Sequence, residues 1–191
     1  ILLHQKVSKE EAKKQVIEIF RQVGIPEPEK RYRSYPHQLS GGLRQRVMIG
    51  MAMVCRPKVM IADEPTTALD VTIEAQILRL MKKLRDDFGT SIILITHNMG
   101  VVAEVCDYVY VMYAGKVMEE AETFALFENT SHPYTRGLLR SIPRLDQREE
   151  RLYTIKGVVP NLLHLPQGCS FCTRCPYAKE ECFLKRPELY E

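Results

Sequence analysis

The chain has 191 residues, 45% of them hydrophobic, which is enough for one globular domain with a core and a small appendage. Its 27 basic and 24 acidic residues leave a formal net charge of +3, too balanced to predict nucleic acid as a partner. No apolar run approaches the roughly 20 residues that cross a bilayer, so any membrane role is predicted to be peripheral.

The first predicted element is an amphipathic helix that begins after Ser8. Ser8 and Glu11 form a capping-box pattern, and apolar residues then recur at helical spacing until residues 24–26 end the helix. Residues 27–36 are polar, aromatic and broken by proline, so they are predicted to form a loop. A second helix is expected to begin just after Ser40.

From residue 54 the pattern changes to short apolar runs that alternate with helical segments. The expected strands cover residues 59–62, 91–96 and 108–113, and the expected helices cover 73–85 and 99–106. Continuous apolar strands of this kind indicate a largely parallel sheet covered on both faces, and therefore an α/β core. Ala114-Gly115 is predicted to form a tight turn into a last strand near residues 116–119, which gives a hairpin at the sheet edge.

Beyond about Glu128 the periodic pattern weakens, because prolines break the chain into short pieces. We therefore expect three parts: a helical subdomain over residues 1–53, an α/β core over 54–128 and an irregular extension over 129–191. The sequence contains no internal repeat and no low-complexity segment, which argues against a solenoid or a linker.

Two adjacent carboxylates, Asp63 and Glu64, follow the predicted strand over residues 59–62. The carboxyl edge of such a sheet is where α/β proteins bind ligands. In phosphoryl transfer Asp63 would hold Mg²⁺, usually through water, and Glu64 would orient and deprotonate the attacking water. The structural alternative is an acidic pair that merely precedes a helix capped by Thr66 or Thr67. Taken alone, the pair does not decide between these interpretations.

Ser40-Gly41-Gly42 lies just before a predicted helix. A hydroxyl, a permissive backbone and free N–H groups at a positive helix end suit a terminal phosphate. A short Ser-Gly-Gly is more often a loop that leads into a helix cap. The three residues alone do not distinguish a phosphate-binding site from a helix cap, so the surrounding sequence is needed.

Longer strings favour the chemical interpretation in both places. Residues 39–45, Leu-Ser-Gly-Gly-Leu-Arg-Gln, resemble the signature of ABC ATPases, with Tyr-Pro-His-Gln ahead of them. Residues 63–70, Asp-Glu-Pro-Thr-Thr-Ala-Leu-Asp, resemble the end of the Walker B motif and the D-loop of the same family. Residues 92–97 resemble the next strand and its switch histidine, His97. The resemblance implies part of a P-loop NTPase core with a helical subdomain.

The resemblance also implies roles for individual residues. Glu64 and His97 would be catalytic, with His97 contacting the γ-phosphate and holding Glu64 and the water in place. The residues implied to contact ATP and its Mg²⁺ are Ser40, Gly41, Gly42, Gln45, Asp63 and Asp70. Because the family hydrolyses ATP across a dimer, Ser40 and Gly42 would serve the nucleotide of the partner subunit. Asp70 would link the two sites.

No Gly-x-x-x-x-Gly-Lys-[Ser/Thr] phosphate loop occurs in the sequence. Gly115-Lys116 is not a substitute, because Tyr110 stands where the first glycine belongs and Val117 where the hydroxyl belongs. In the family this loop lies further upstream of the signature than the residues before Leu39 reach. We therefore expect the chain to be the C-terminal part of such an ATPase, and we expect it not to hold ATP on its own.

Residues 132–139, 168–171 and 174–176 resemble the C-terminal extension of oligopeptide and dipeptide importer ATPases, a group that includes nickel importers. This resemblance implies an ATPase that energises peptide uptake at the cytoplasmic face of the cell membrane. The implied partners are a second ATPase subunit, two transmembrane permease subunits and, indirectly, an extracytoplasmic substrate-binding protein.

Two alternatives belong to other functional classes. A soluble ABC ATPase of translation or DNA repair would lack the His-Pro-Tyr-Thr extension that begins at His132. A non-catalytic metal-binding interaction module would have no need of Glu64 and His97.

Four of the six cysteines crowd together near the end of the chain: Cys169, Cys172, Cys175 and Cys182. Three thiolates at two-residue intervals resemble the loop around a [4Fe–4S] cluster in bacterial ferredoxins, whereas structural Zn²⁺ more often uses two separated Cys-x₂-Cys pairs. The spacing favours iron–sulfur over zinc, with free thiols as a third interpretation. Some members of the importer group carry such a cluster, although Cys172 occupies a position that often holds another residue. We expect a structural role, because metal binding can supply the folding energy that a small extension lacks.

Overall fold

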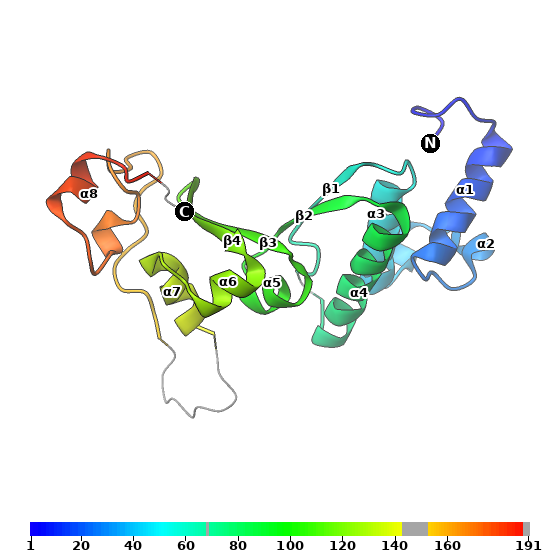
Figure 1. Cartoon of the computed structure of the whole chain (residues 1–191). Coiled ribbons are helices and arrows are strands. Elements are labelled where there is room, and N and C mark those ends of the chain that lie inside the picture. The colour runs from blue at the N-terminus through cyan, green and yellow to red at the C-terminus, as the bar shows by residue number, and fades with distance from the viewer. Residues whose placement is uncertain (68, 143–152, 189–191) are drawn as a thin grey trace. The chain divides into compact units, whose positions relative to one another are not determined.

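The computed structural model describes residues 1–67, 69–142 and 153–188, and the chain packs as two compact units, 1–97 and 98–191 (Figure 1). Each unit combines parts of two predicted domains, so the domain boundaries predicted from the sequence stay predictions. Within the described residues, no helix is long and apolar enough to cross a membrane.

Helix α1 (Lys9–Gln22) begins where its cap predicted, and the Ser8 Oγ accepts a hydrogen bond from the Glu11 backbone N–H at 3.1 Å. The loop predicted over residues 27–36 is wrong in part. It contains the helical turn α2 (Pro28–Arg31), whose first residue is a proline that suits this position because its missing N–H would be unpaired anyway. A 3₁₀ turn, η1 (Pro36–Gln38), then leads to α3 (Gly41–Met53), which starts directly after Ser40 as predicted.

The sheet of the first unit has two parallel strands, β1 (Val59–Asp63) and β2 (Ser91–Ile95), in a register that places Asp63 opposite Ile95. Helix α4 (Val71–Phe88) connects them and ends at Gly89, whose φ of +63° is easy only for glycine. The core joins α1, α3 and α4 to one face of this sheet. Its most deeply buried side chains include Val23, Met53, Ile77 and Leu84.

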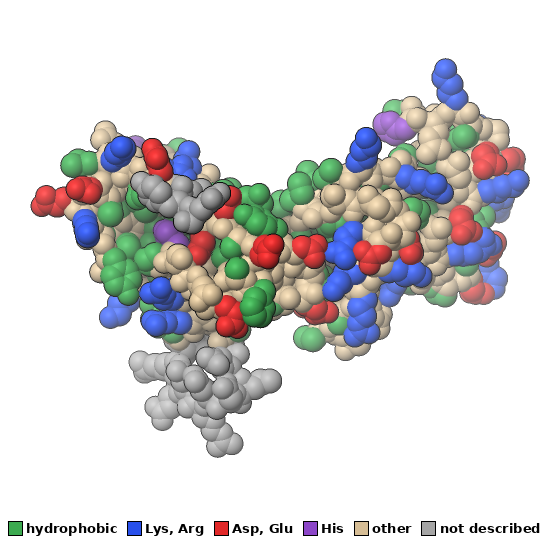
Figure 2. All heavy atoms as spheres, viewed as in Figure 1, with side chains coloured by type: hydrophobic (Ala, Val, Ile, Leu, Met, Phe, Trp, Pro, Cys, Tyr) green, Lys and Arg blue, Asp and Glu red, His purple; other side chains and the backbone are tan. Residues whose placement is uncertain are grey.

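The prediction that both faces of the strands are covered is wrong for the described chain. Met60 and Ala62 of β1 are buried, whereas Val59 and Ile61 on the opposite face are 52% and 67% exposed. Continuous apolar runs indicate two-sided burial only when elements exist to cover both faces, and in this unit helices pack on one face. On the view in Figure 2, acidic and basic side chains are interspersed over the helices of this unit.

The second unit begins with α5 (Met99–Val105) and the predicted hairpin, which is confirmed. Strands β3 (Tyr108–Tyr113) and β4 (Lys116–Glu122) pair antiparallel. Ala114 and Gly115 take φ values of +48° and +74°, the geometry of a two-residue turn that follows the twist of the strands. The described strands thus form two two-stranded sheets, β1–β2 in the first unit and β3–β4 in the second, and the single larger sheet stays a prediction.

The extension contains more regular structure than its prolines suggested. The sequence predicted short irregular pieces beyond Glu128. Helix α6 (Thr123–Glu128) ends where the extension begins. The extension itself contains α7 (Pro133–Arg140), η2 (Cys172–Arg174) and α8 (Glu180–Leu184). Phe171 is only 1% exposed and packs in one cluster with Tyr113 and Met118 of the hairpin. Because the extension shares this core with the hairpin, its packing does not depend on its own few apolar residues.

Candidate functional site

The predicted acidic pair lies at the carboxyl edge of the parallel sheet. Asp63 is the last residue of β1, and Glu64 follows it with a φ of +44°, a left-handed conformation that is costly for a residue with a side chain. The backbone N–H of Glu64 donates to the carbonyl oxygen of Ile95 at 2.9 Å. This bond extends the β1–β2 ladder by one residue and holds Glu64 beside the end of β2.

Two side chains contact the Glu64 carboxylate, one at each oxygen. The hydroxyl of Thr67 donates to Oε2 at 2.9 Å, and Nδ1 of His97 lies 3.1 Å from Oε1. The hydrogen bond from Thr67, followed by that from His97, lowers the pKa of Glu64. The Glu64 side chain is 46% exposed, so the carboxylate is anionic and open to water. It can therefore accept a proton from a water molecule placed against it.

Thr67 was not singled out by the sequence as part of this site. It was considered individually only in the alternative of a helix cap, and the structure gives that role to Asp70, which caps α4 through a bond from the Ile73 N–H to Oδ1 at 3.0 Å. The signal that could have found Thr67 is its spacing: a hydroxyl three residues after an acid, across the turn-forming Pro65. The predicted role of Asp70 in linking two ATP sites stays a prediction.

The signature residues form the start of α3. Ser40 is its N-cap, with Oγ accepting from the Leu43 N–H at 3.4 Å, and Gly41 is exposed at the first helical position. A Cβ at Gly42 would lie 3.0 Å from Cγ2 of Ile73, so a glycine here lets α3 approach α4 closely. Gln45 is half-buried one turn further along. These positions have structural roles, and their phosphate contacts stay predictions.

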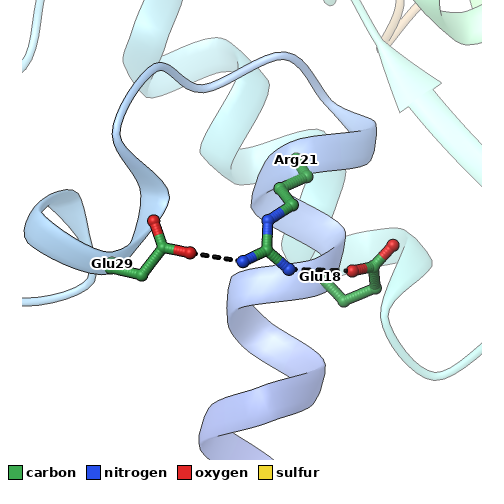
Figure 3. Close-up of polar contacts among 3 residues, drawn as sticks. All are labelled: Glu18, Arg21 and Glu29. Atoms are coloured by element: carbon green, nitrogen blue, oxygen red, sulfur yellow. Dashed lines mark hydrogen bonds and ion pairs between the residues drawn. The ribbon is translucent and has the colours of Figure 1, made fainter.

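Charged side chains tie the loop before the signature to α1. Arg21 pairs with Glu18 on its own helix at 3.1 Å and reaches across to Glu29 on α2 (Figure 3). All three side chains are more than half exposed, so solvent screens the pairs and they orient α2 more than they stabilise the fold. The sequence did not predict this contact, because Glu29 was placed in a loop.

Arg46 connects the signature helix to two other helices. Its guanidinium donates to the Val23 carbonyl oxygen at 2.7 Å and to Oε1 of Gln76 on α4 at 3.2 Å. A charged donor at the carbonyl end of α1 is favourable because the last carbonyls of a helix lack partners. Arg46 therefore fixes how α3, and with it Ser40, is held against α1 and α4.

The four clustered cysteines are brought near one another by the backbone. The N–H of Cys169 donates to the carbonyl oxygen of Cys182 at 2.8 Å, and Cys172 is buried within this loop. Burial, followed by the nearby Cys169 thiol, raises the pKa of Cys172. All four thiols are free. In the part of the chain that the structure describes, no three His, Cys, Asp or Glu side chains are arranged to hold a metal ion, so the iron–sulfur cluster stays a prediction from the spacing.

An aromatic and cationic cluster packs around Phe171, inside the cysteine loop. The ring of Phe171 contacts Tyr113 edge-on, with centroids 5.2 Å apart, and also packs on Tyr134. Arg174 lies over the Phe171 ring, and its guanidinium donates to the Ile155 carbonyl oxygen at 2.8 Å. These contacts pack the cysteine loop against the hairpin, and the expected contribution of a metal to the folding energy of the extension stays a prediction.

Comparison with known proteins gives two family matches in one chain. Residues 2–67 match the model described as "ABC transporter", and residues 118–182 match "Oligopeptide/dipeptide transporter, C-terminal region". The first match ends at the Glu64–Thr67 turn, and the second covers most of the hairpin strand β4 and the cysteine loop.

Curated relatives match along almost the whole chain. The oligopeptide transport ATP-binding protein OppD of Haemophilus influenzae is 54% identical over 94% of this chain and 56% of the relative. OppD of Escherichia coli is 53% identical over 98% and 56%, and AppD of Bacillus subtilis is 51% identical over 99% and 58%. The chain spans about half the length of the curated relatives it matches.

A solved structure supports the fold. The dimeric structure of MJ0796, a bacterial ABC transporter cassette, matches 61% of this chain and 49% of its own chain, with 32% identity and a TM-score of 0.53. The motifs, the two family matches and this likeness agree. The chain belongs to the ABC transporter ATP-binding proteins, in the group that carries the oligopeptide/dipeptide transporter C-terminal region.

Proposed function

We propose that the protein hydrolyses ATP to energise the import of oligopeptides or dipeptides. One observation carries the proposal: the Glu64 carboxylate, at the end of one parallel strand, lies within hydrogen-bond distance of His97, just past the end of the next. A base oriented by a second side chain at a sheet edge is the arrangement that water-activating sites require. Relatives named as oligopeptide transport ATP-binding proteins support the substrate class.

The carboxylates divide the chemistry between them. Glu64 accepts the proton of the attacking water, since its free lone pairs face solvent. The exposed Asp63, at the tip of β1, is the residue that would hold Mg²⁺ through water, and its oxygen ligands suit that ion. When bound, Mg²⁺ neutralises charge on the phosphates. Two adjacent residues would thus have different roles, Asp63 in cation binding and Glu64 in proton transfer.

His97 orients Glu64 and reaches towards the phosphate. Nδ1 lies 3.1 Å from Oε1 of Glu64, so Nε2 is the ring nitrogen left to contact a phosphate. His97 is therefore proposed to hold Glu64 through Nδ1 and to contact the γ-phosphate through Nε2.

The signature surface is proposed to act on a second subunit. Ser40, Gly41, Gly42 and Gln45 would contact ATP bound by a partner ATPase, and Asp70 would link the two sites. The proposed assembly has two ATPase subunits and two permease subunits, receives peptide from an extracytoplasmic binding protein and lies on the cytoplasmic face of the membrane. The dimeric cassette with which this chain shares its fold supports the pairing.

A [4Fe–4S] cluster at Cys169, Cys172, Cys175 and Cys182 is proposed from spacing, with Zn²⁺ as the alternative. The backbone bond between Cys169 and Cys182 supports it, because the first and last cysteines of the loop are neighbours. Binding would require the thiols to converge further than they do in the structure. The cluster has no part in the proposed hydrolysis.

The test is peptide uptake by the full-length protein, assembled with its permease subunits and second ATPase in vesicles. ATP hydrolysis that rises with peptide-loaded binding protein is expected, and His97→Ala should abolish both hydrolysis and uptake. Hydrolysis by a protein that never co-purifies with the permease would favour a soluble ABC ATPase. The absence of turnover in the complete assembly would favour a non-catalytic module.

A further inference from the structure

We propose that Thr67 is a positioning residue that holds the Glu64 carboxylate in its water-activating orientation, an inference that rests on the proposed ATPase function. The Thr67 hydroxyl donates to Oε2 of Glu64 at 2.9 Å, while His97 contacts the other oxygen, Oε1. The two contacts together fix the plane of the carboxylate, which a single contact leaves free to rotate. Each carboxylate oxygen has a second lone pair, so water can still bind.

The hydroxyl is not needed to form the turn in which it lies. The backbone N–H of Thr67 already donates to the Glu64 carbonyl oxygen at 3.2 Å, and the Leu69 N–H donates to the Thr66 carbonyl oxygen at 3.1 Å. These two bonds close the turn by themselves. The Thr67 side chain is directed at the carboxylate and not at the backbone, where a threonine in a turn usually donates or accepts.

A second contact to Glu64 matters because the His97 side chain is highly exposed. Its side chain is 80% exposed against 46% for Glu64, so packing does little to hold the ring in place. A histidine that also serves a phosphate shifts as that phosphate changes. Thr67 belongs to the same four-residue turn as Glu64 and moves with it. Thr67 therefore keeps the Glu64 carboxylate oriented during hydrolysis, when the His97 contact alone would leave the carboxylate free to rotate.

The experiment is a double-mutant cycle in the full-length protein assembled with its permease and ATPase partners. Thr67→Val keeps the side-chain shape and removes the donor, and Thr67→Ser keeps the donor. We expect Thr67→Val to lower kcat about tenfold, the worth of one hydrogen bond to a charged group, with KM for ATP unchanged. Thr67→Ser should restore most of the rate. In a Glu64→Gln background, Thr67→Val should cause no further loss.

Controls separate positioning from folding. Thr72→Val makes the same change on the exposed face of α4 and should leave kcat unchanged. Thr67→Ala serves as a second donor-free variant, and the melting temperature of each assembly checks its folding. A wild-type rate in Thr67→Val and Thr67→Ala, a raised KM with unchanged kcat, or an equal loss in the Glu64→Gln background would each overturn the Thr67 proposal alone. A wild-type assembly without ATP turnover would overturn the proposed function, and the role of Thr67 with it.

Discussion

Two regions differ in how well the sequence predicts the arrangement of their side chains. One is the hydrolytic edge, the end of the parallel sheet that carries Glu64 and His97, and the other is the cysteine loop, residues 169–182. At the edge, Glu64 and His97 are 33 positions apart and meet because two parallel strands end side by side. In the extension, four cysteines lie within 14 positions of one another, yet no three of the described side chains are arranged around a metal. The residues that are distant in sequence were the easier ones to place.

The difference follows from what fixes each side chain. A strand register is set by a ladder of backbone bonds, so the residues after two paired strands are neighbours whatever their side chains are. The direction of a thiol in a loop depends on each backbone angle between the cysteines. Spacing along an irregular loop is therefore a weaker predictor of a site than position at a sheet edge.

The largest expected effect tests the hydrolytic edge. Glu64→Gln in the full-length assembly should lower ATP turnover roughly 10²–10⁴-fold, the usual worth of a general base, and leave ATP binding intact. The isosteric amide cannot take a proton from water. Steady-state hydrolysis and nucleotide affinity measure the two quantities separately. A turnover close to that of the wild type would remove Glu64 from the chemistry.

The next effect tests the core of the extension. Phe171→Ala should cost about 3–5 kcal/mol in the free energy of local opening, since it removes a ring that is 1% exposed. Hydrogen exchange of the amides from Gly168 to Phe183 in the full-length protein measures this opening. Phe171→Leu, the matched control, should cost less than about 1.5 kcal/mol. Unchanged protection in Phe171→Ala would show that something other than the aromatic cluster holds the loop.

A metal test sharpens the same contrast. Under the cluster proposal, anaerobically purified protein contains iron and absorbs visible light, and Cys175→Ser loses both. Because Phe171 and Arg174 hold the loop by packing, removal of the metal should open it by less than Phe171→Ala does. Stoichiometric zinc without iron would contradict the iron–sulfur proposal and favour a Zn²⁺ site. Full unfolding of the extension by a chelator would restore metal binding as its main source of stability.

The smallest expected effect concerns pH and the start of α7. Nδ1 of His132 accepts the Tyr134 N–H at 3.1 Å, and burial lowers the pKa of His132, against an opposing effect of Glu119. The unfolded chain therefore takes up the proton at a higher pH than the folded chain. The contribution of the His132 cap to the free energy of unfolding is fully present above the ordinary pKa of histidine. It is lost as the pH drops below that value, and the loss is about 1 kcal/mol, the usual worth of a helix cap.

Melting curves between pH 8 and pH 5 measure this loss. His132→Asn keeps an acceptor at the cap and cannot titrate, so its melting temperature should fall less over the same range. An equal fall in both proteins would assign the pH dependence to other groups.

The sequence by itself determined the family, the α1 cap at Ser8, the start of α3, the Ala114-Gly115 hairpin and the acidic pair with its histidine. These features are local patterns, or strings long enough to be specific, so neighbouring residues suffice to define them. Only the tertiary structure decided that Thr67 contacts Glu64, that Arg46 joins three helices and that Phe171 packs under the cysteine loop. Those contacts depend on the direction of side chains across turns and between elements, which no spacing in the sequence records.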